Sequence, residues 1–394
     1  KAETHARFAD ALEQAPPPGA TPGELAALVA PHRIRGPEPE RALASVAGAV
    51  AELERAGRPE AAVDLARRAL ALDATKGHAR VALLSKLTDG LTTLGRPDEV
   101  RAALVEAQAI AAREGLAQAT PGLLVLDARR LFEAGEFEAC LATSRRALEA
   151  GGPGPWPGRA NALAWQGQSL WCLGRHAEAR ACHEQALAEA VAAGSATDEM
   201  SACTNLAAVL NELGLLPEAE ARLRRAHEIS RAAGRRPSDA AVLNLGNVLA
   251  DQGRAADALA CYEDSRAYCR TVGVREGEAV AYVNIGAVRQ RVGDFEGSEE
   301  ALLRCVDICR EIGSRRVLGY GLAALAELEY LRGDLAKARR LFDEALELRR
   351  ALDNRHAIAG TLFSLAVLDL AEDRFEDARA RLDEAEALAV SVGD

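Results

Sequence analysis

The residues of this chain that could do chemistry begin with a pair of cysteines. Cys305 and Cys309 are four residues apart, a spacing that puts two side chains on one face of a helix. A zinc ion bound there would need two more ligands, with each sulfur about 2.3 Å from the metal. No Cys-x-x-Cys or His-Glu-x-x-His motif supplies them. We interpret the pair as packing residues and expect no metal site.

The other candidate groups do not form a reactive set either. His183 follows Cys182 at a place where large packing residues recur, so we expect a packed histidine. Glu299 and Glu300 are neighbours on one helix, and neighbours do not face a common site. The chain lacks a glycine-rich phosphate loop and any nucleophile, base and orienting residue in a set. We therefore predict no catalytic residue, no cofactor and no enzyme activity.

A second group of polar residues could bind a partner. Asn205, Asn244 and Asn284 follow one another at steps of 39 and 40 residues. Asparagine is a mediocre helix former, whereas its amide can both donate to and accept from an extended peptide backbone. Tryptophan and arginine nearby could supply anchoring energy. The full candidate set is Trp165, Gln168, Trp171, Asn205, Asn211, Asn244, Asn247, Asn284, Gln290 and Arg291. The alternative is that the asparagines only tie adjacent helices together.

These asparagines keep step with a repeat that runs through most of the chain. Glycine recurs every 38 to 40 residues between two apolar stretches with helical periodicity, and Asp373 takes the ninth place. The turn positions are Gly57, Gly95, Gly135, Gly174, Gly214, Gly253, Gly293, Gly333 and Asp373. Glycine is favoured there because the chain leaves a helix with a backbone conformation that a β-carbon resists. Aspartate tolerates this conformation better than most residues.

Small residues recur in the same register. Five residues after the turns stand Ala62, Val100, Cys140, Ala179, Ala219, Ala258, Ser298, Ala338 and Ala378. Twelve residues after them stand Ala69, Ala107, Ala147, Ala186, Ala226, Ser265, Cys305, Ala345 and Ala385. Large residues come between the two sets, at Leu104, Leu223, Tyr262, Leu302, Phe342 and Leu382. Small side chains at fixed points let helices approach closely, so the pattern predicts stacked helix pairs.

The segment "NLGNVLADQGRAADALACYEDS", Asn244 to Ser265, resembles the tetratricopeptide-repeat family. The resemblance implies an all-α solenoid, a right-handed superhelix of about nine helix-turn-helix repeats over residues 41–394, whose first helices line a concave groove. Its unit of 39–40 residues exceeds the usual length of about 34, as in long-repeat variants resembling kinesin light chains and bacterial regulatory proteins. The asparagine position faces the groove in family members. The basic residues of chaperone-binding relatives are replaced by Ser201, Ala240 and Val280.

Residues 1–40 do not fit the repeat, and we expect an N-terminal helical cap or linker there. The run Ala15–Gly23 breaks helices, and short helices are predicted at Thr4–Glu13 and Glu24–Val29. This segment is similar to the one that joins a nucleotide-binding module to its repeats in bacterial signal-transduction ATPases and transcription activators. The chain also starts at Lys1 rather than methionine, which suggests a piece of a longer protein. A second break, Gly151–Gly158, carries a tryptophan that we expect to fold back onto a helix end.

Composition narrows the range of partners. The net charge is −11 without a basic stripe, which argues against nucleic acid and against an anionic membrane surface. No apolar run reaches the length of about 18 residues that a membrane span needs. Eight cysteines spread through 394 residues do not suggest a disulfide framework, so we expect a reduced, cytoplasmic setting.

The sequence thus predicts a scaffold that binds a peptide or helical segment of a partner protein in the concave groove. The alternative is a sensor or regulatory arm of a larger signalling ATPase, kinase or transcription regulator. Self-association through the ends or the convex face is left open.

Overall fold

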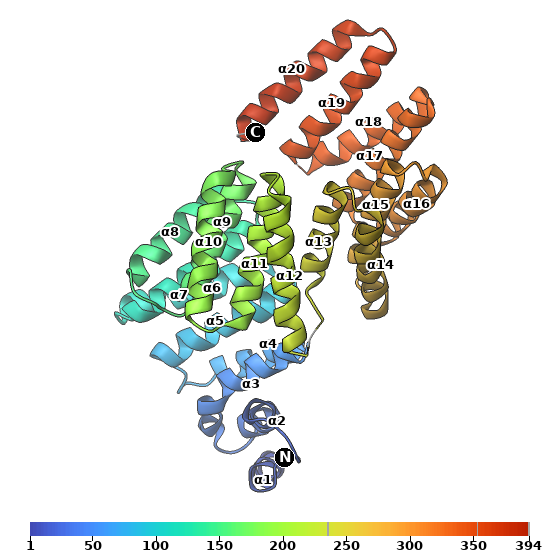
Figure 1. The fold of residues 1–394 in the computed structure, drawn as a ribbon. Coiled ribbons are helices and arrows are strands. Elements are labelled where there is room, and N and C mark those ends of the chain that lie inside the picture. Colours follow the sequence, from blue (N-terminus) through green and yellow to red (C-terminus); the bar gives the residue numbers. More distant parts are fainter. Residues whose placement is uncertain (235, 353, 393–394) are drawn as a thin grey trace. The chain divides into compact units, whose positions relative to one another are not determined.

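The computed structural model describes residues 1–234, 236–352 and 354–392, where every regular element is an α- or 3-10 helix (Figure 1). The described chain contains nine helix-turn-helix pairs, which confirms the predicted all-α solenoid of repeats. The first helices are α3 (Leu43–Arg55), α5 (Gly77–Thr93), α7 (Thr120–Glu133), α9 (Arg159–Cys172), α11 (Ala196–Glu212), α13 (Asp239–Asp251), α15 (Arg275–Arg291), α17 (Arg315–Arg332) and α19 (Arg355–Ala371). The second helices are α4 (Pro59–Leu70), α6 (Pro97–Arg113), α8 (Phe137–Gly151), α10 (His176–Ala192), α12 (Leu216–Ala232), α14 (Ala255–Val272), α16 (Phe295–Ile312), α18 (Leu335–Ala351) and α20 (Phe375–Val392).

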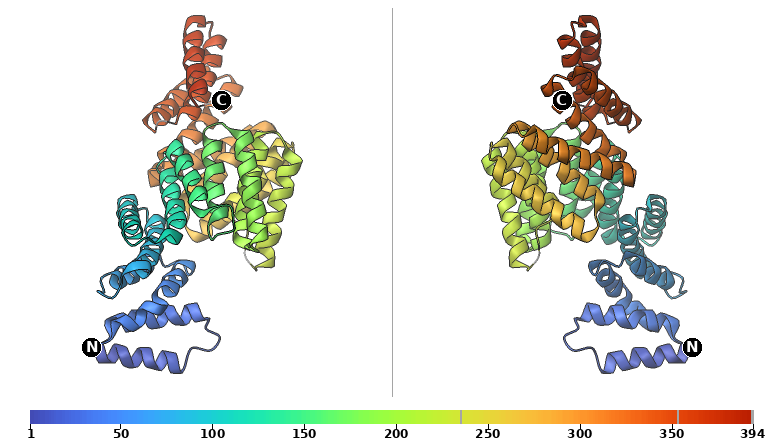
Figure 2. Two further views of the ribbon diagram at one scale, coloured as in Figure 1. Left: turned by 90° about the vertical axis from the view of Figure 1, so that its left-hand side faces the viewer. Right: turned by 90° about the vertical axis from the view of Figure 1, so that its right-hand side faces the viewer.

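The helices form two compact units, Lys1–Ser169 and Leu170–Asp394, which divide within α9. Inside each unit the two helices of a pair lie side by side, and each pair packs on the next (Figure 2). Such nearest-neighbour packing is how a repeat protein builds a continuous core from units too small to fold alone. The candidate binding residues from Trp171 onward all belong to the second unit.

The turn inside each pair has the predicted conformation. All eight turn glycines have positive φ, and Asp373 is the one non-glycine residue with positive φ, 58°, in the described chain. At each turn the following N–H donates to a carbonyl oxygen five residues earlier, as Arg254 does to Leu249 O at 2.8 Å. This is the Schellman arrangement that ends a helix with a left-handed residue. The turn positions predicted from the sequence are therefore confirmed.

The two columns of small residues are buried along the whole solenoid. Every residue five or twelve positions after a turn is buried, from Ala62 in the first pair to Ala385 in the last. The large residues between them are buried too, with one exception. Leu382 is 38% exposed because α20, the final helix, packs chiefly on α19.

A second series of glycines separates the pairs from one another. Each lies 20 residues after a turn glycine and has positive φ: Gly115, Gly194, Gly234, Gly273 and Gly313. This second period is also present in the sequence, between the second helix of one pair and the first helix of the next. The two series together end both helices of most repeats.

Two further helices precede the first pair. They are α1 (Ala2–Gln14) and α2 (Pro22–Arg35), followed by the 3-10 helix η1 (Pro39–Ala42); a second 3-10 helix, η2 (Ala117–Ala119), precedes α7. Thr21 and Glu24 form a reciprocal capping box at the start of α2, with bonds of 3.2 and 2.7 Å. The predicted role of residues 1–40 as a cap or linker stays a prediction.

The break at Gly151–Gly158 contains a tryptophan that does fold back. Trp156 packs partly buried against Leu124, Val125 and Ala147, and its indole covers Gly151 so closely that a β-carbon there would overlap the ring. Trp156 therefore belongs to the core of the first unit rather than to an exposed contact.

Candidate functional site

The predicted binding column lies along the first helices of the repeats. Asn205 is on α11, Asn244 on α13 and Asn284 on α15, and all three side chains are half-buried. These helices pack in series within the second unit, α11 on α13 and α13 on α15. The repeat thus brings the same amide to the same place on three successive helices.

Two of these asparagines make no side-chain hydrogen bond within the described part of the chain. The side-chain amides of Asn244 and Asn284 have no hydrogen-bond partner within residues 1–234, 236–352 and 354–392, although water reaches both. Gln290 on α15 is also half-buried and without a side-chain partner there, but it follows Asn284 by six residues and therefore lies on another side of the helix. We call the surface formed by Asn244 and Asn284 the amide face. Asn205 is engaged within the chain, so it is not part of the amide face.

The other polar candidates are tied into the solenoid. Asn211 Nδ2 donates to Asp251 Oδ2 at 3.2 Å, and Arg291 pairs with the same carboxylate at 3.4 Å. Arg291 also donates to Ala250 O at 2.8 Å. Asp251 therefore links α11, α13 and α15 near their C-terminal ends. The alternative interpretation, that polar residues here connect adjacent helices, describes Asn211 and Arg291 well.

Asn247 has a similar internal role. Its Oδ1 accepts a hydrogen bond of 2.7 Å from the hydroxyl of Tyr262 on α14. Burial raises the pKa of Tyr262 well above its usual value, so the phenol stays protonated and keeps donating. The ring of Tyr262 also fills the space above Gly246. Asn247 thus positions a core tyrosine and has one amide group left for solvent.

Unlike the asparagines of the amide face, the two tryptophans and Gln168 are packed against or bonded to other parts of the chain, or have a buried polar atom. Trp165 is half-buried in the first unit, where its ring lies 5.4 Å from that of Phe132. Gln168 is half-buried and engaged within the chain. Trp171 is half-buried, and its buried Nε1 has no acceptor in the described residues. Trp165 is thus chiefly a packing residue.

The cysteines lie where the packing columns put them. Cys305 and Cys309 are fully buried, with 3.9 Å between their sulfur atoms, in a cluster with Ala279, Ile308 and Val317. The contact with Cys309 and burial raise the pKa of the Cys305 thiol. Among the described residues, no three His, Cys, Asp or Glu side chains gather as a metal site would require. The pair therefore acts as two small hydrophobic groups.

His183 is the most unusual titratable group in the second unit. It is fully buried on α10, and neither ring nitrogen has a hydrogen-bond partner in the described chain. Burial lowers its pKa from 6.5 to about 4, because the charged imidazolium would lose its hydration. His183 is therefore neutral at pH 7. It occupies a place that leucine, tyrosine or phenylalanine fills in other repeats.

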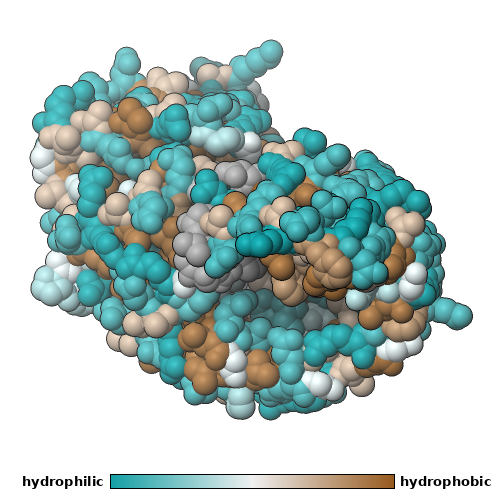
Figure 3. Space-filling view, turned by 90° about the horizontal axis from the view of Figure 1, so that it is seen from above, coloured by the Kyte–Doolittle hydropathy of each residue, from teal (hydrophilic) through white to brown (hydrophobic). Residues whose placement is uncertain are grey.

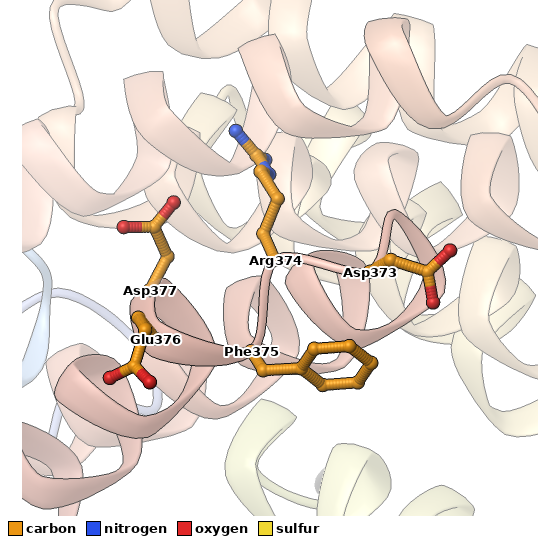
Figure 4. Close-up of a pocket in the computed structure, with 5 residues that line it drawn as sticks. All are labelled: Asp373, Arg374, Phe375, Glu376 and Asp377. Carbon is orange, nitrogen blue, oxygen red and sulfur yellow. The ribbon is translucent and has the colours of Figure 1, made fainter.

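Two surface hollows are formed by residues outside the amide face. One, about 320 Å³, is formed by residues 373–377 at the ninth turn, where the side chains point in different directions rather than toward a common centre (Figure 4). The other, about 470 Å³, lies between the turn after α5 and the end of α7. The diverging side chains of the first hollow do not point toward one bound group.

The outer surface is mixed in polarity. On the face shown in Figure 3, hydrophilic and hydrophobic residues alternate over the described atoms without one continuous apolar area. Within the described residues, no helix has the length and apolar character of a membrane span.

Comparison with known proteins identifies the repeat. Three tetratricopeptide-repeat models match the chain, one at residues 238–311, one at 200–233 and 322–357, and one at 160–185. The solved structure of a Rap protein complexed with competence and sporulation factor is similar over 90% of this chain and 99% of that one, with 15% identity and a TM-score of 0.67. A tetratricopeptide repeat protein from Parabacteroides merdae has 12% identity over 72% of this chain and 98% of its own, with a TM-score of 0.49. No curated protein matches the sequence.

Proposed function

Because this chain belongs to the tetratricopeptide-repeat family, and such repeats are protein-interaction scaffolds, we propose that its amide face binds an extended segment of a partner protein. In this proposal the first helices line a concave groove, and Asn244 and Asn284 bind the backbone of the segment. The observation that carries it is that both amides are open to solvent and have no partner in the described chain.

The spacing of the two asparagines suits an extended strand. Packed helices lie about 8–10 Å apart, and α13 packs on α15. An extended chain rises about 3.3 Å per residue, so the two amides would bind backbone groups about three residues apart. The interior N–H and C=O groups of a helix are already paired. An extended segment is therefore favoured over a helical one.

The similarity to the Rap protein supports the proposal at the level of architecture. That protein was solved with a bound factor, so a solenoid of this fold can hold a ligand. The proposal gives this chain a binding role and no catalytic one. The proposed partner is a protein or peptide, and its identity would follow from the chemistry selected at the amide face.

The test begins with random 12-residue peptides displayed on phage and selected on the wild-type chain. The tightest peptide is then titrated against Asn244→Ala/Asn284→Ala by fluorescence anisotropy. If each amide makes one hydrogen bond worth about 0.5–1.5 kcal/mol, the double variant loses about 1–3 kcal/mol and should bind roughly 5- to 150-fold more weakly.

Gln108→Ala/Gln185→Ala is the matched control. It also removes two amides without side-chain partners in the described chain, but from the second helices α6 and α10, and should leave affinity unchanged. Far-ultraviolet circular dichroism checks that all variants keep their helices. Equal affinity of the wild type and the asparagine double variant, or failure of any peptide to be selected, would contradict the proposal.

A further inference from the structure

One acidic residue lies beside the amide face without a partner. Glu327 is on α17, three residues after Ala324, which holds the asparagine position in the eighth repeat. Residues three apart share one side of a helix, and α17 packs on α15, the helix of Asn284. Glu327 is exposed and forms no hydrogen bond or ion pair in the described part of the chain.

The nearest cation makes its hydrogen bonds through Nη1 to other groups, and its Nε has no partner in the described chain. Arg349 on α18 donates to Ala357 O at 3.0 Å and to Thr361 Oγ1. Its guanidinium also lies 5.1 Å from the ring centre of Tyr320. Arg349 attracts Glu327 through its charge but does not pair with it. The carboxylate is therefore available to a cation from outside.

The surroundings of Glu327 favour such a cation. Although Glu327 is exposed, the atoms around its carboxyl partly desolvate it, and this desolvation raises the pKa of the carboxyl against the opposing effect of Arg349. A carboxylate with reduced hydration and no partner gains more from an incoming cation than a fully hydrated one.

Other acidic residues on these helices are already neutralised. Asp251 pairs with Arg291. Glu329, two residues after Glu327, pairs with Arg332 at 3.4 Å and with Lys337 at 2.7 Å. Glu327 thus differs from the acidic residues around it because it forms no ion pair.

Resting on the proposed function, we propose that Glu327 binds the lysine or arginine side chain of the segment whose backbone is bound by Asn244 and Asn284. The helix of Glu327 is the next first helix after that of Asn284, a step of about 10 Å or three extended residues. The partner would therefore carry a basic residue about three positions beyond the backbone group bound by Asn284.

The experiment is a double-mutant cycle on the full chain with peptides selected as above. Each lysine or arginine of the tightest peptide is replaced in turn by glutamine, and all peptides are titrated against the wild type and Glu327→Gln. We expect one basic residue whose replacement weakens wild-type binding roughly tenfold and has no further effect on Glu327→Gln. Glu300→Gln is the matched control, because Glu300 is exposed and unpaired in the described chain but lies on the second helix α16.

The outcomes separate the two proposals. A basic residue coupled to Glu327 and uncoupled from Glu300 supports the cation site. If Asn244→Ala/Asn284→Ala weakens binding but no basic residue is coupled to Glu327, the cation site is overturned and the proposed function stands. Coupling to Glu327 without any effect of the asparagines overturns the backbone-binding role and retains the cation site. If no peptide is selected, both proposals are overturned.

Discussion

Replacing His183 with leucine should stabilise the fourth repeat and remove a pH dependence from its stability. His183 is fully buried with both ring nitrogens unpartnered in the described chain. Each buried polar atom without a partner costs about 1–3 kcal/mol. Leucine occupies the same place in other repeats, at Leu223 and Leu302. Since the variant removes two such atoms, it should be more stable at pH 7 by about 2–6 kcal/mol.

The pH dependence follows from the lowered pKa of His183. Its pKa is about 4 in the folded chain and 6.5 as the ordinary value, so the unfolded state binds the proton more tightly. The stability due to neutral His183 is present above pH 6.5 and is lost as the pH falls toward 4. One pKa unit corresponds to about 1.4 kcal/mol, so the loss reaches about 2 kcal/mol between pH 7 and 5 and about 3 kcal/mol below pH 4.

Amide hydrogen exchange of α10, followed by mass spectrometry at pH 7 and pH 5, measures this locally. A local probe is needed because repeat proteins open in parts rather than in one step. After correction for the intrinsic exchange rate, the stability advantage of His183→Leu should grow by about 2 kcal/mol at the lower pH. His78→Gln is the control, since His78 is exposed. An advantage that is the same at both pH values would refute the reasoning.

Two other predictions concern glycine and the turns. Gly246→Ala should lower the free energy of unfolding by about 1–3 kcal/mol, because the new β-carbon would lie 2.9 Å from Tyr262 Cδ1. Gly360→Ala should raise it by up to about 1 kcal/mol, because nothing lies within 4 Å of the new β-carbon there. Urea unfolding followed by circular dichroism compares them, and equal effects would contradict the packing described here. Asp373→Gly should raise stability by about 0.5–1 kcal/mol, because φ is 58° at this turn and glycine adopts it without steric cost; an unchanged or lower thermal midpoint would argue against this.

The fold could be predicted from the sequence because the same turn and packing residues recur in every repeat. A single Gly or Ala says little, whereas Gly253 followed by Ala258 and Ser265 in a register shared by nine units fixes both the turn and the close helix contacts. The exception is informative, since Leu382 fits the pattern and is exposed for lack of a following helix in the described chain. The packing positions that every repeat shares can thus be predicted from the sequence, whereas the neighbours of the ninth repeat cannot.

The candidate site could be predicted only in part. The position of Asn244 and Asn284 followed from the repeat, but whether an amide is open depends on its neighbours. Asn247 is occupied because Tyr262 happens to reach it, and Asn211 because Asp251 does. Glu327 was missed altogether. Its availability results from the contacts that Arg349 makes elsewhere, and no spacing in the sequence indicates this. The cytoplasmic location and the role as a regulatory arm stay predictions.

The central claim is that Asn244 and Asn284 bind the backbone of an extended partner. The most direct measurement is an N-methyl scan of the selected peptide, in which each backbone N–H is blocked in turn and affinity is measured for the wild type and for Asn244→Ala/Asn284→Ala. We expect two positions about three residues apart where methylation weakens binding to the wild type and leaves the variant unaffected. A scan with the same profile for both proteins would contradict the claim.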